Sequence, residues 1–401
     1  MPRESMESAL ERWLDEQTRT SRRAFIGRAG SAGLALSGLS AVLAACGGVS
    51  GTDTNKVDLN ATGNHPKTKI TTLDFSNWPL YIDKSVLKTW DKQTGGHVNY
   101  IEDINDNNDF FGKVRQQLIQ GQPIGRDLVA LTTYMAAKWV RNGYTEAIDK
   151  RNVPNAKNLT PQLRHPKYDP NRNYTLPWQT GPTGIGYNIK ETGREIRSTK
   201  ELFSPEWKGR VTALSEPYDS AGLVLAMQGK NPTAATIDQQ LGAIDFIGQA
   251  QQKGQFRRFT GNDYTTDLTK GNVAIAMAYG GDMVQLQSDN PNMRFSYPEE
   301  GAMQFEDDMM IPEKAAHPYA AENMMNFVYE PEIAAKIAAY VNYISPVEGV
   351  KEVLLKTNPK LANDPLLFPG EAIRKRMYPY PTFTDAEERK MYAAMAQVTG
   401  S

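Results

Sequence analysis

The stretch PWQTGPTGIGYN, residues 177–188, interrupts a regular alternation of predicted strands and helices. Its density of proline and glycine is typical of a segment that crosses between two domains. Before it, β-branched and apolar runs at 69–75, 97–101 and 127–131 predict strands, and the stretches between them carry apolar residues at helical spacing. Strands that alternate with helices at this short spacing predict an α/β domain built on a parallel sheet.

A second block of the same kind follows the crossing segment. Residues 210–214 and 273–278 predict strands, whereas 221–228 and 237–252 predict helices. Residues 320–343 predict two further helices that are broken at Pro331. Because a chain of 401 residues can form two domains of about 150 residues each, we expect two α/β lobes.

The composition excludes several classes of protein. With 45 Lys+Arg against 46 Asp+Glu, the chain lacks the basic excess that is typical of general nucleic-acid binders. Its single cysteine excludes an internal disulfide framework and any cysteine-rich zinc or iron–sulfur site. The 4 histidines lie far apart and show no metal-ligand spacing. We therefore expect no nucleic-acid partner, no metal and no cofactor.

The N-terminal region has the features of an export signal. Arg22 and Arg23 precede an uncharged stretch over 29–52, within which the string LAAC ends at Cys46. A positive segment, an apolar stretch and small residues before a cleavage point are the parts of a secretory signal. A transmembrane helix is the alternative, because the uncharged stretch is long enough to span a bilayer, but its glycine and serine content disfavours one.

Two strings in this region resemble known export motifs. SRRAFI at 21–26 resembles the twin-arginine motif. LAAC at 43–46 resembles a bacterial lipobox, which implies that the thiol of Cys46 takes a diacylglycerol and becomes the mature N-terminus. A buried core thiol is the alternative for Cys46. We expect a lipoprotein signal peptide over 1–45 and a flexible tether over 46–67.

Acidic and aromatic residues gather where predicted strands end. In open α/β sheets the ligand crevice lies outside the carboxyl ends of the strands. Aromatic faces attract ammonium groups, and carboxylates compensate for the desolvation of a cation. The pattern therefore predicts binding of an elongated organic cation, and the residues that form it are Trp78, Tyr81, Thr132, Tyr134, Glu216, Asp219, Tyr279, Phe305 and Asp307.

Several of these residues also have a purely structural explanation. Glu216 or Asp219 can cap the helix that follows them. Trp78 and Tyr134 can be ordinary core aromatics. The neighbouring Asp308 fits a solvated loop.

From about residue 69 to residue 376 the chain resembles the spermidine/putrescine-binding family of bacterial ABC transporters. The resemblance rests on FSNWxxY at 75–81, DLV at 127–129, TTY at 132–134, YTLPW at 174–178, TGIGYN at 183–188, EWKGRV at 206–211, PEEG at 298–301 with the later Asp307, and YISP at 343–346. It implies an α/β, two-lobed, periplasmic-binding-protein-like fold of type II with two hinge crossings. We expect the crossings near Gly181 and Asp307, lobe 1 over 68–180 plus 307–350, and lobe 2 over 181–306 plus 351–401.

The same resemblance assigns roles to individual residues. It implies that Trp78, Tyr81 and Tyr134 wall one side of the cleft and that Thr132 offers a hydroxyl. Glu216 and Asp219 would bind one ammonium group, Asp307 would hold another amine beside Tyr279 and Phe305, and Tyr343 would close the box. Pro79 and Leu80 stand where the family has a polar, often acidic pair. Glu306 and Asp308 are the candidates to replace that acidic anchor.

The function implied by the resemblance is solute capture. We expect an exported, lipid-anchored monomer that binds putrescine or spermidine between its lobes and delivers it to an ABC permease, without enzyme activity. One alternative is a binding protein of the same fold for a sugar, another amino compound or a metal chelate. The other is a glycosidase-like hydrolase that uses Glu216 and Asp307.

Overall fold

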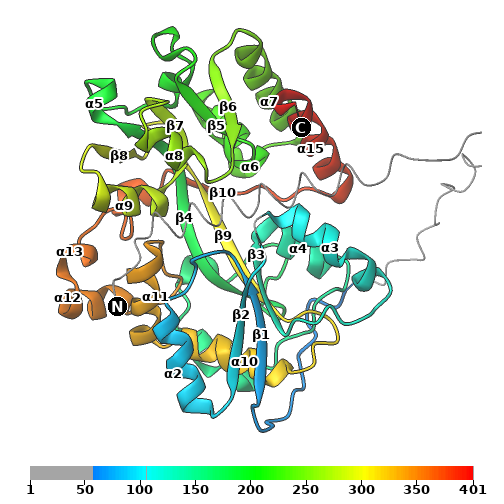
Figure 1. The fold of residues 1–401 in the computed structure, drawn as a ribbon. Coiled ribbons are helices and arrows are strands. Elements are labelled where there is room, and N and C mark those ends of the chain that lie inside the picture. Colours follow the sequence, from blue (N-terminus) through cyan, green and yellow to red (C-terminus); the bar gives the residue numbers. More distant parts are fainter. Residues whose placement is uncertain (1–56, 105, 401) are drawn as a thin grey trace, which may run out of the picture. The chain divides into compact units, whose positions relative to one another are not determined.

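The computed structural model describes residues 57–104 and 106–400 (Figure 1). Arg22, Arg23 and Cys46, and with them the predicted signal peptide, lie outside the described residues. Among the helices in the described part of the chain, none is long and apolar enough to cross a membrane.

All strands of the described chain join one sheet, in the order β2-β1-β3-β9-β4-β7-β5-β6, with β10 paired to β9 and β8 paired to β4. Their bounds are β1 (Thr72–Asn77), β2 (His97–Glu102), β3 (Leu128–Thr132), β4 (Thr175–Asn188), β5 (Val211–Leu214), β6 (Phe256–Thr260), β7 (Ile275–Tyr279), β8 (Met293–Ser296), β9 (Ala302–Met310) and β10 (Met377–Pro379). Pairs β1–β2, β1–β3, β5–β6 and β5–β7 are parallel, as the alternation of strands and helices predicts.

The long strands β4 and β9 run antiparallel through both lobes. At one end β9 pairs with β3, where Thr132 lies opposite Asp307. At the other end β4 pairs with β7, where Thr183 lies opposite Tyr279. The two strands are therefore the two crossings, and the predicted two-lobed fold of type II is confirmed. The proline- and glycine-rich crossing segment is itself a strand, and its register shifts between Pro177 and Gln179.

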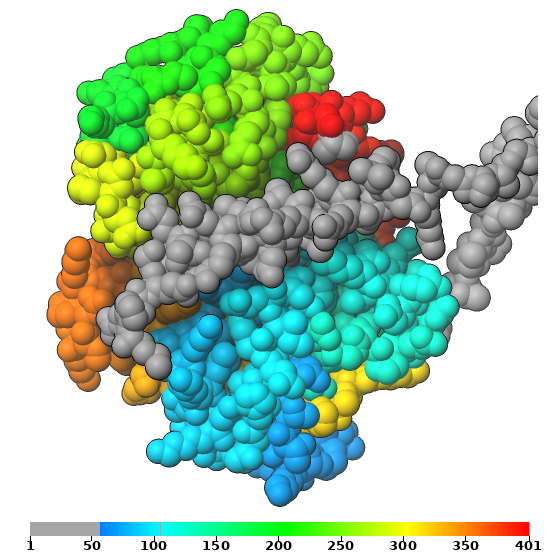
Figure 2. Space-filling model, viewed as in Figure 1, coloured from blue at the N-terminus to red at the C-terminus, as the bar shows by residue number. Residues whose placement is uncertain are grey.

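Lobe 1 surrounds β1, β2 and β3, and lobe 2 surrounds β5, β6 and β7; Figure 2 shows them as a blue-to-cyan part and a green-to-yellow part. Lobe 1 carries α2 (Lys84–Thr94), α3 (Asn107–Ile119), α4 (Thr133–Arg141), α10 (Pro318–Val328) and α11 (Pro331–Val341). Lobe 2 carries α5 (Ile189–Thr192), α6 (Pro217–Met227), α7 (Ile237–Gln252), α8 (Tyr264–Thr269), α9 (Gly280–Asp289) and α15 (Asp385–Thr399). Short 3-10 helices are η1 (Lys150–Asn152), η2 (Pro154–Asn158), η3 (Pro161–Leu163), η4 (Thr199–Phe203), η5 (Pro205–Trp207) and η6 (Pro232–Ala234).

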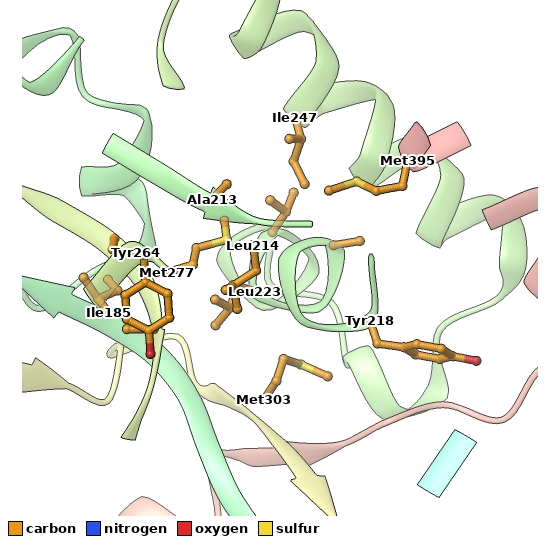
Figure 3. Packing of buried hydrophobic residues seen from close by; sticks show 14 of the residues in the cluster. Ile185, Ala213, Leu214, Tyr218, Leu223, Ile247, Tyr264, Met277, Met303 and Met395 are labelled. Carbon is orange, nitrogen blue, oxygen red and sulfur yellow. The ribbon is translucent and has the colours of Figure 1, made fainter. Parts of the chain in front are cut away.

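The core of lobe 2 holds α6 in place beneath the site. Nearly all of α6 is buried, from Pro217 to Ala226. Gly222 lets the Met303 side chain of β9 pack closely on the helix, since an added Cβ would lie 2.4 Å from the sulfur of Met303 and would displace that side chain. Figure 3 shows the side chains of Ile247 and Met395 pointing toward one another, which packs α15 on α7. Burial of each such side chain contributes about 1.5–3 kcal/mol.

The boundary expected at residue 350 is wrong. Helices α12 (Val350–Thr357) and α13 (Pro359–Ala362) place Val350, Leu354 and Ala362 in the core of lobe 1 together with Trp90 of α2. Their apolar face covers lobe 1 because α12 packs directly on the preceding α11. The chain first reaches lobe 2 at Leu366 and Leu367, which pack with Val284 of α9. After α14 (Glu371–Arg374), β10 pairs with Ala302–Gln304 of β9.

Part of the predicted flexible tether is bound to lobe 1. The backbone oxygen of Asp58 accepts from the Tyr174 hydroxyl at 2.9 Å, and the amide of Gly63 donates to Ile148 at 3.2 Å. Nδ1 of His65 lies 2.6 Å from Oε1 of Glu322. The tether prediction is therefore wrong for residues 57–67.

Candidate functional site

Asp307 lies at the hinge, where β9 passes beside the end of β3. Its Oδ2 accepts from the Tyr81 hydroxyl at 2.7 Å, and its Oδ1 accepts from the Thr132 hydroxyl at 2.8 Å. Asn107, at the start of α3, holds Thr132 through its amide at 2.9 Å. Burial raises the pKa of Asp307 to about 6, although both hydroxyl donors favour its ionised form.

Asp219 lies in the first turn of α6 and is fully buried. It accepts from the hydroxyls of Thr183 at 2.7 Å, Tyr380 at 2.7 Å and Tyr279 at 3.2 Å. Burial raises the pKa of Asp219 to about 6, against the effect of these donors. Residues from β4, from β7 and from the segment after β10 therefore meet at one carboxyl group.

Glu216 caps α6, since its carboxylate accepts from the backbone amide of Tyr218 at 3.3 Å. The capping explanation is thus correct, but the same carboxylate also faces the site. It accepts from the Tyr392 hydroxyl at 3.0 Å and from the Tyr134 hydroxyl at 3.4 Å. Burial, and then the negative charge of Asp219, raise the pKa of Glu216 to about 8.

Asp282, in the first turn of α9, is a fourth site carboxylate that sequence reasoning missed. It accepts from Tyr264 at 2.6 Å, from Tyr343 at 3.0 Å and from the amide of Asn262 at 3.1 Å. Burial raises the pKa of Asp282. Its position just after the strand end at Tyr279 was the signal that could have identified it.

Aromatic rings connect these carboxylates in an edge-to-face series. Ring centroids are separated by 5.7 Å between Tyr81 and Tyr343, by 5.5 Å between Tyr343 and Phe305, and by 5.6 Å between Phe305 and Tyr279. Glycine is required beside them, because a Cβ at Gly281 would lie 2.5 Å from the Tyr343 ring. The predicted site residues on β7, β9 and after α11 are therefore brought together.

Tyr134 and Trp78 are placed differently. The Tyr134 ring stacks on Tyr218 at 5.0 Å, and Tyr218 stacks on Tyr380 at 5.1 Å, so Tyr134 lies at the Glu216 end of the site. Trp78 is half-buried and packs against the core clusters of both lobes. Within the described chain it makes no ring contact or side-chain hydrogen bond with the other predicted site residues, and its indole N–H has no partner.

Glu306 and Asp308 do not replace the missing acidic anchor. They lie on the opposite face of β9 from Asp307, where Arg172 pairs with Glu306 at 2.5 Å and with Asp308 at 2.7 Å. Asp308 is fully buried within β9, so the solvated-loop explanation is wrong. Leu80, which stands with Pro79 where the resembled family has a polar, often acidic pair, is 63% exposed.

Within the part of the chain that the structure describes, the four site carboxylates have no basic partner. The ion pairs of the described residues involve neither Glu216, Asp219, Asp282 nor Asp307. Hydroxyl and amide donors orient these groups without neutralising them. Asp219 and Asp307 are buried, whereas Glu216 and Asp282 are half-buried. A buried carboxylate without a counter-ion is costly, so the arrangement favours a cationic occupant.

Sequence reasoning also missed the hydroxyl donors Thr183, Tyr264, Tyr380 and Tyr392. Tyr392 comes from α15, and Tyr380 follows β10, far along the chain from the carboxylates that they contact. No local sequence pattern identifies Tyr380 and Tyr392 as site residues, since only the packing of the C-terminal segment on lobe 2 brings them to the site.

The chain has two α/β lobes joined by two crossing strands, with carboxylates and aromatic rings gathered between the lobes. This arrangement is that of the two-lobed solute-binding proteins. Residues 85–369 match the family described as bacterial extracellular solute-binding protein, and the chain belongs to that family. The comparisons with individual proteins agree with this assignment.

The chain is 27% identical over 341 residues to the putrescine-binding periplasmic protein SpuD of Pseudomonas aeruginosa, covering 80% of this chain and 90% of SpuD. It is 26% identical over 327 residues to the putrescine-binding periplasmic protein PotF of Escherichia coli, covering 77% and 85%. The structure of the spermidine/putrescine ABC transporter substrate-binding protein PotD from Streptococcus pneumoniae matches with a TM-score of 0.70 at 23% identity, covering 82% of this chain and 98% of PotD. This structural match establishes the shared fold.

Proposed function

We propose that this protein captures a polyamine, putrescine or spermidine, between its lobes and delivers it to an ABC permease. The observation that carries the proposal is the set of four carboxylates, at Glu216, Asp219, Asp282 and Asp307, without a basic partner in the described chain. Ammonium groups would neutralise them. The rings of Tyr343, Phe305 and Tyr279 would cover the methylene groups between the charges.

The hydrogen bonds that join the lobes support a closing mechanism. Tyr134 of α4 reaches Glu216 of lobe 2, and Tyr343, which follows α11 of lobe 1, reaches Asp282 of α9. Hinge motion about β4 and β9 would separate these pairs and admit solute. Capture would then be reversible binding without bond chemistry, and the proposal assigns no catalytic role to Glu216 and Asp307.

We further propose that the protein is exported as a monomeric lipoprotein. The twin-arginine string with Arg22 and Arg23 would direct export, and a lipid on Cys46 would attach the mature chain to the outer face of the cytoplasmic membrane. Mass spectrometry of the protein from its source membrane tests this: a diacylglyceryl group on Cys46 is expected, and an unmodified thiol contradicts the anchor.

Calorimetry tests the ligand proposal. The full chain carrying Cys46→Ala, which avoids lipid attachment, is titrated with putrescine, spermidine and glucose. Micromolar or tighter binding of a polyamine and no binding of the sugar are expected. Absence of polyamine binding contradicts the proposal, and binding of the sugar instead favours another solute class. A thermal-shift screen with the same compounds provides an independent readout, since a tight ligand raises the Tm.

A further inference from the structure

Helix α4 of lobe 1 presents one face of side chains to lobe 2. Tyr134, Lys138 and Arg141 share this face, because they are four and three positions apart along the helix. The Tyr134 ring stacks on Tyr218 of α6, and Arg141 pairs with Asp385 of α15. This face of α4 therefore carries two positive charges, and it contacts α6 and α15 of lobe 2.

Helix α15 of lobe 2 presents the complementary face. Asp385, Glu388 and Tyr392 share it, because they are three and four positions apart. Nη2 of Arg141 donates to Oδ1 of Asp385 at 2.6 Å and lies 3.9 Å from Oε1 of Glu388. From within lobe 2, the Tyr218 hydroxyl donates to Glu388 at 3.2 Å. Two acids of lobe 2 thus face the cations of lobe 1, through helices that are not part of the hinge.

The pKa values of these two acids reflect the contact with α4. Burial tends to raise the pKa of Asp385, but its hydrogen bond with Arg141 and the charges of Arg141 and Lys138 hold that pKa below its ordinary value. Burial raises the pKa of Glu388 to about 7, against the attraction of the same two cations. Contact with α4 therefore favours the ionised form of both acids.

Solvent reaches the contact between the two helix faces. The side chains of Arg141 and Asp385 are 32% and 33% exposed. A cavity of about 340 Å³ lies beside the contact, and its lining includes Lys138 of α4 together with Glu388 and Tyr392 of α15. Ion pairs that solvent reaches are weakened by salt. Ionic strength should therefore weaken this contact far more than it weakens the apolar core of either lobe.

We propose that the ion pairs of Arg141 with Asp385 and Glu388 form a charge latch that favours the closed arrangement of the lobes when no solute is bound. This inference rests on the hinge closure of the proposed function. Hinge opening would separate α4 from α15 and break these ion pairs. Since the affinity of a protein for its solute scales with the population of the binding-competent state, the charge latch would raise affinity from outside the site.

Single-molecule FRET on the protein without solute tests the charge latch. The full chain carrying Cys46→Ala also carries Lys88→Cys in α2 of lobe 1 and Gln252→Cys in α7 of lobe 2, both at exposed positions, for a donor and an acceptor dye. Arg141→Gln should raise the ratio of open to closed molecules by about twofold to fivefold, as is typical for loss of a partly exposed ion pair. Raising the NaCl concentration to about 1 M should shift the parent protein in the same direction and the variant much less.

Two further variants separate the charge latch from a general effect of losing an arginine. Arg210→Gln breaks the ion pair with Glu191 inside lobe 2, where the side chains are 41% and 34% exposed, and should leave the ratio unchanged. Arg141→Lys keeps the charge and should keep most of the closed population. The Tm shows that each variant is folded. An unchanged ratio in folded Arg141→Gln, or an equal shift in Arg210→Gln, overturns the charge latch.

This readout needs no solute, so its outcome is separable from the proposed function. The expected shift in Arg141→Gln, in a protein that binds no polyamine, supports the charge latch and contradicts only the proposed ligand. A single distance between the dyes in every variant and at every salt concentration overturns the charge latch together with the proposed hinge closure.

Discussion

The hydroxyl of Tyr343 lies 3.0 Å from Oδ1 of Asp282 and thereby joins the segment after α11 in lobe 1 to α9 in lobe 2. The same ring contacts both Tyr81 and Phe305, so one side chain connects the aromatic series with the contact between the lobes. Hinge closure, as proposed above, would therefore complete the aromatic series in the same step that brings the lobes together.

Replacing Tyr343 with Phe should remove this hydrogen bond and keep the ring contacts. The net contribution of one such bond is about 1 kcal/mol, so we expect affinity to fall by about fivefold to tenfold, mostly through faster dissociation. Stopped-flow kinetics with spermidine measures the dissociation rate. Tyr340→Phe, at a position 40% exposed in α11, is the matched control; an equal effect in both variants would contradict the role of Tyr343.

Replacing Asp307 with Asn should have the largest effect on affinity. Asp307 is 5% exposed, and loss of one member of a buried charge pair costs about 3–5 kcal/mol, so we expect affinity to fall by at least about 150-fold. Calorimetry measures this, with Asp289→Asn at the exposed end of α9 as the control. Unchanged affinity in a folded Asp307→Asn protein would remove this residue from the site.

The ligand-free protein should become less stable as pH rises. The pKa values of Asp219 and Asp307 are raised to about 6 and that of Glu216 to about 8, whereas unfolded carboxyl groups titrate near pH 4. Between about pH 4 and pH 8 the folded state holds protons that the unfolded state releases, so the free energy of unfolding falls over that range. Denaturant titrations from pH 5 to pH 8 measure the slope.

We assign the fall in the free energy of unfolding between pH 6 and pH 8 mainly to Glu216. The ionisable groups that face it are Asp219 and Tyr218 of α6, Tyr134 of α4, Tyr392 of α15, and Asp106 before α3. Glu216→Gln should flatten the slope between pH 6 and pH 8, although Glu388, whose pKa burial raises to about 7, leaves some slope in the same direction. A bound polyamine should reverse the trend, and an identical slope in the variant would contradict the assignment.

Replacing Arg172 with Met should destabilise the fold. Arg172 is 5% exposed, and its removal would leave the buried Asp308 and the half-buried Glu306 without a cation. Breaking a buried ion pair in this way costs about 3–5 kcal/mol. Chemical denaturation measures the loss. Adding Glu306→Gln and Asp308→Asn to this variant should recover part of it, because the unpaired charges are then gone. No recovery would show that packing of the Arg172 side chain, not charge, is responsible.

Local patterns in the sequence were sufficient to predict the two lobes and some of the residues of the candidate site. Alternating strands and helices carry their own periodicity, and Glu216, Asp219, Tyr279 and Asp307 lie at strand ends or in the hinge, as the pattern predicts. These features depend on near neighbours along the chain. They can therefore be predicted without knowing which distant segments meet.

Only the tertiary structure decided which acids are available to a ligand. Side chains alternate across a strand, so a shift of one residue in the register of β9 would exchange Asp307 with Glu306 or Asp308. The observed register leaves Asp307 at the site and gives the other two to Arg172. Asp282 and the hydroxyl of Tyr392 join the site only because α9 and α15 pack on it, which depends on contacts between residues far apart in the sequence.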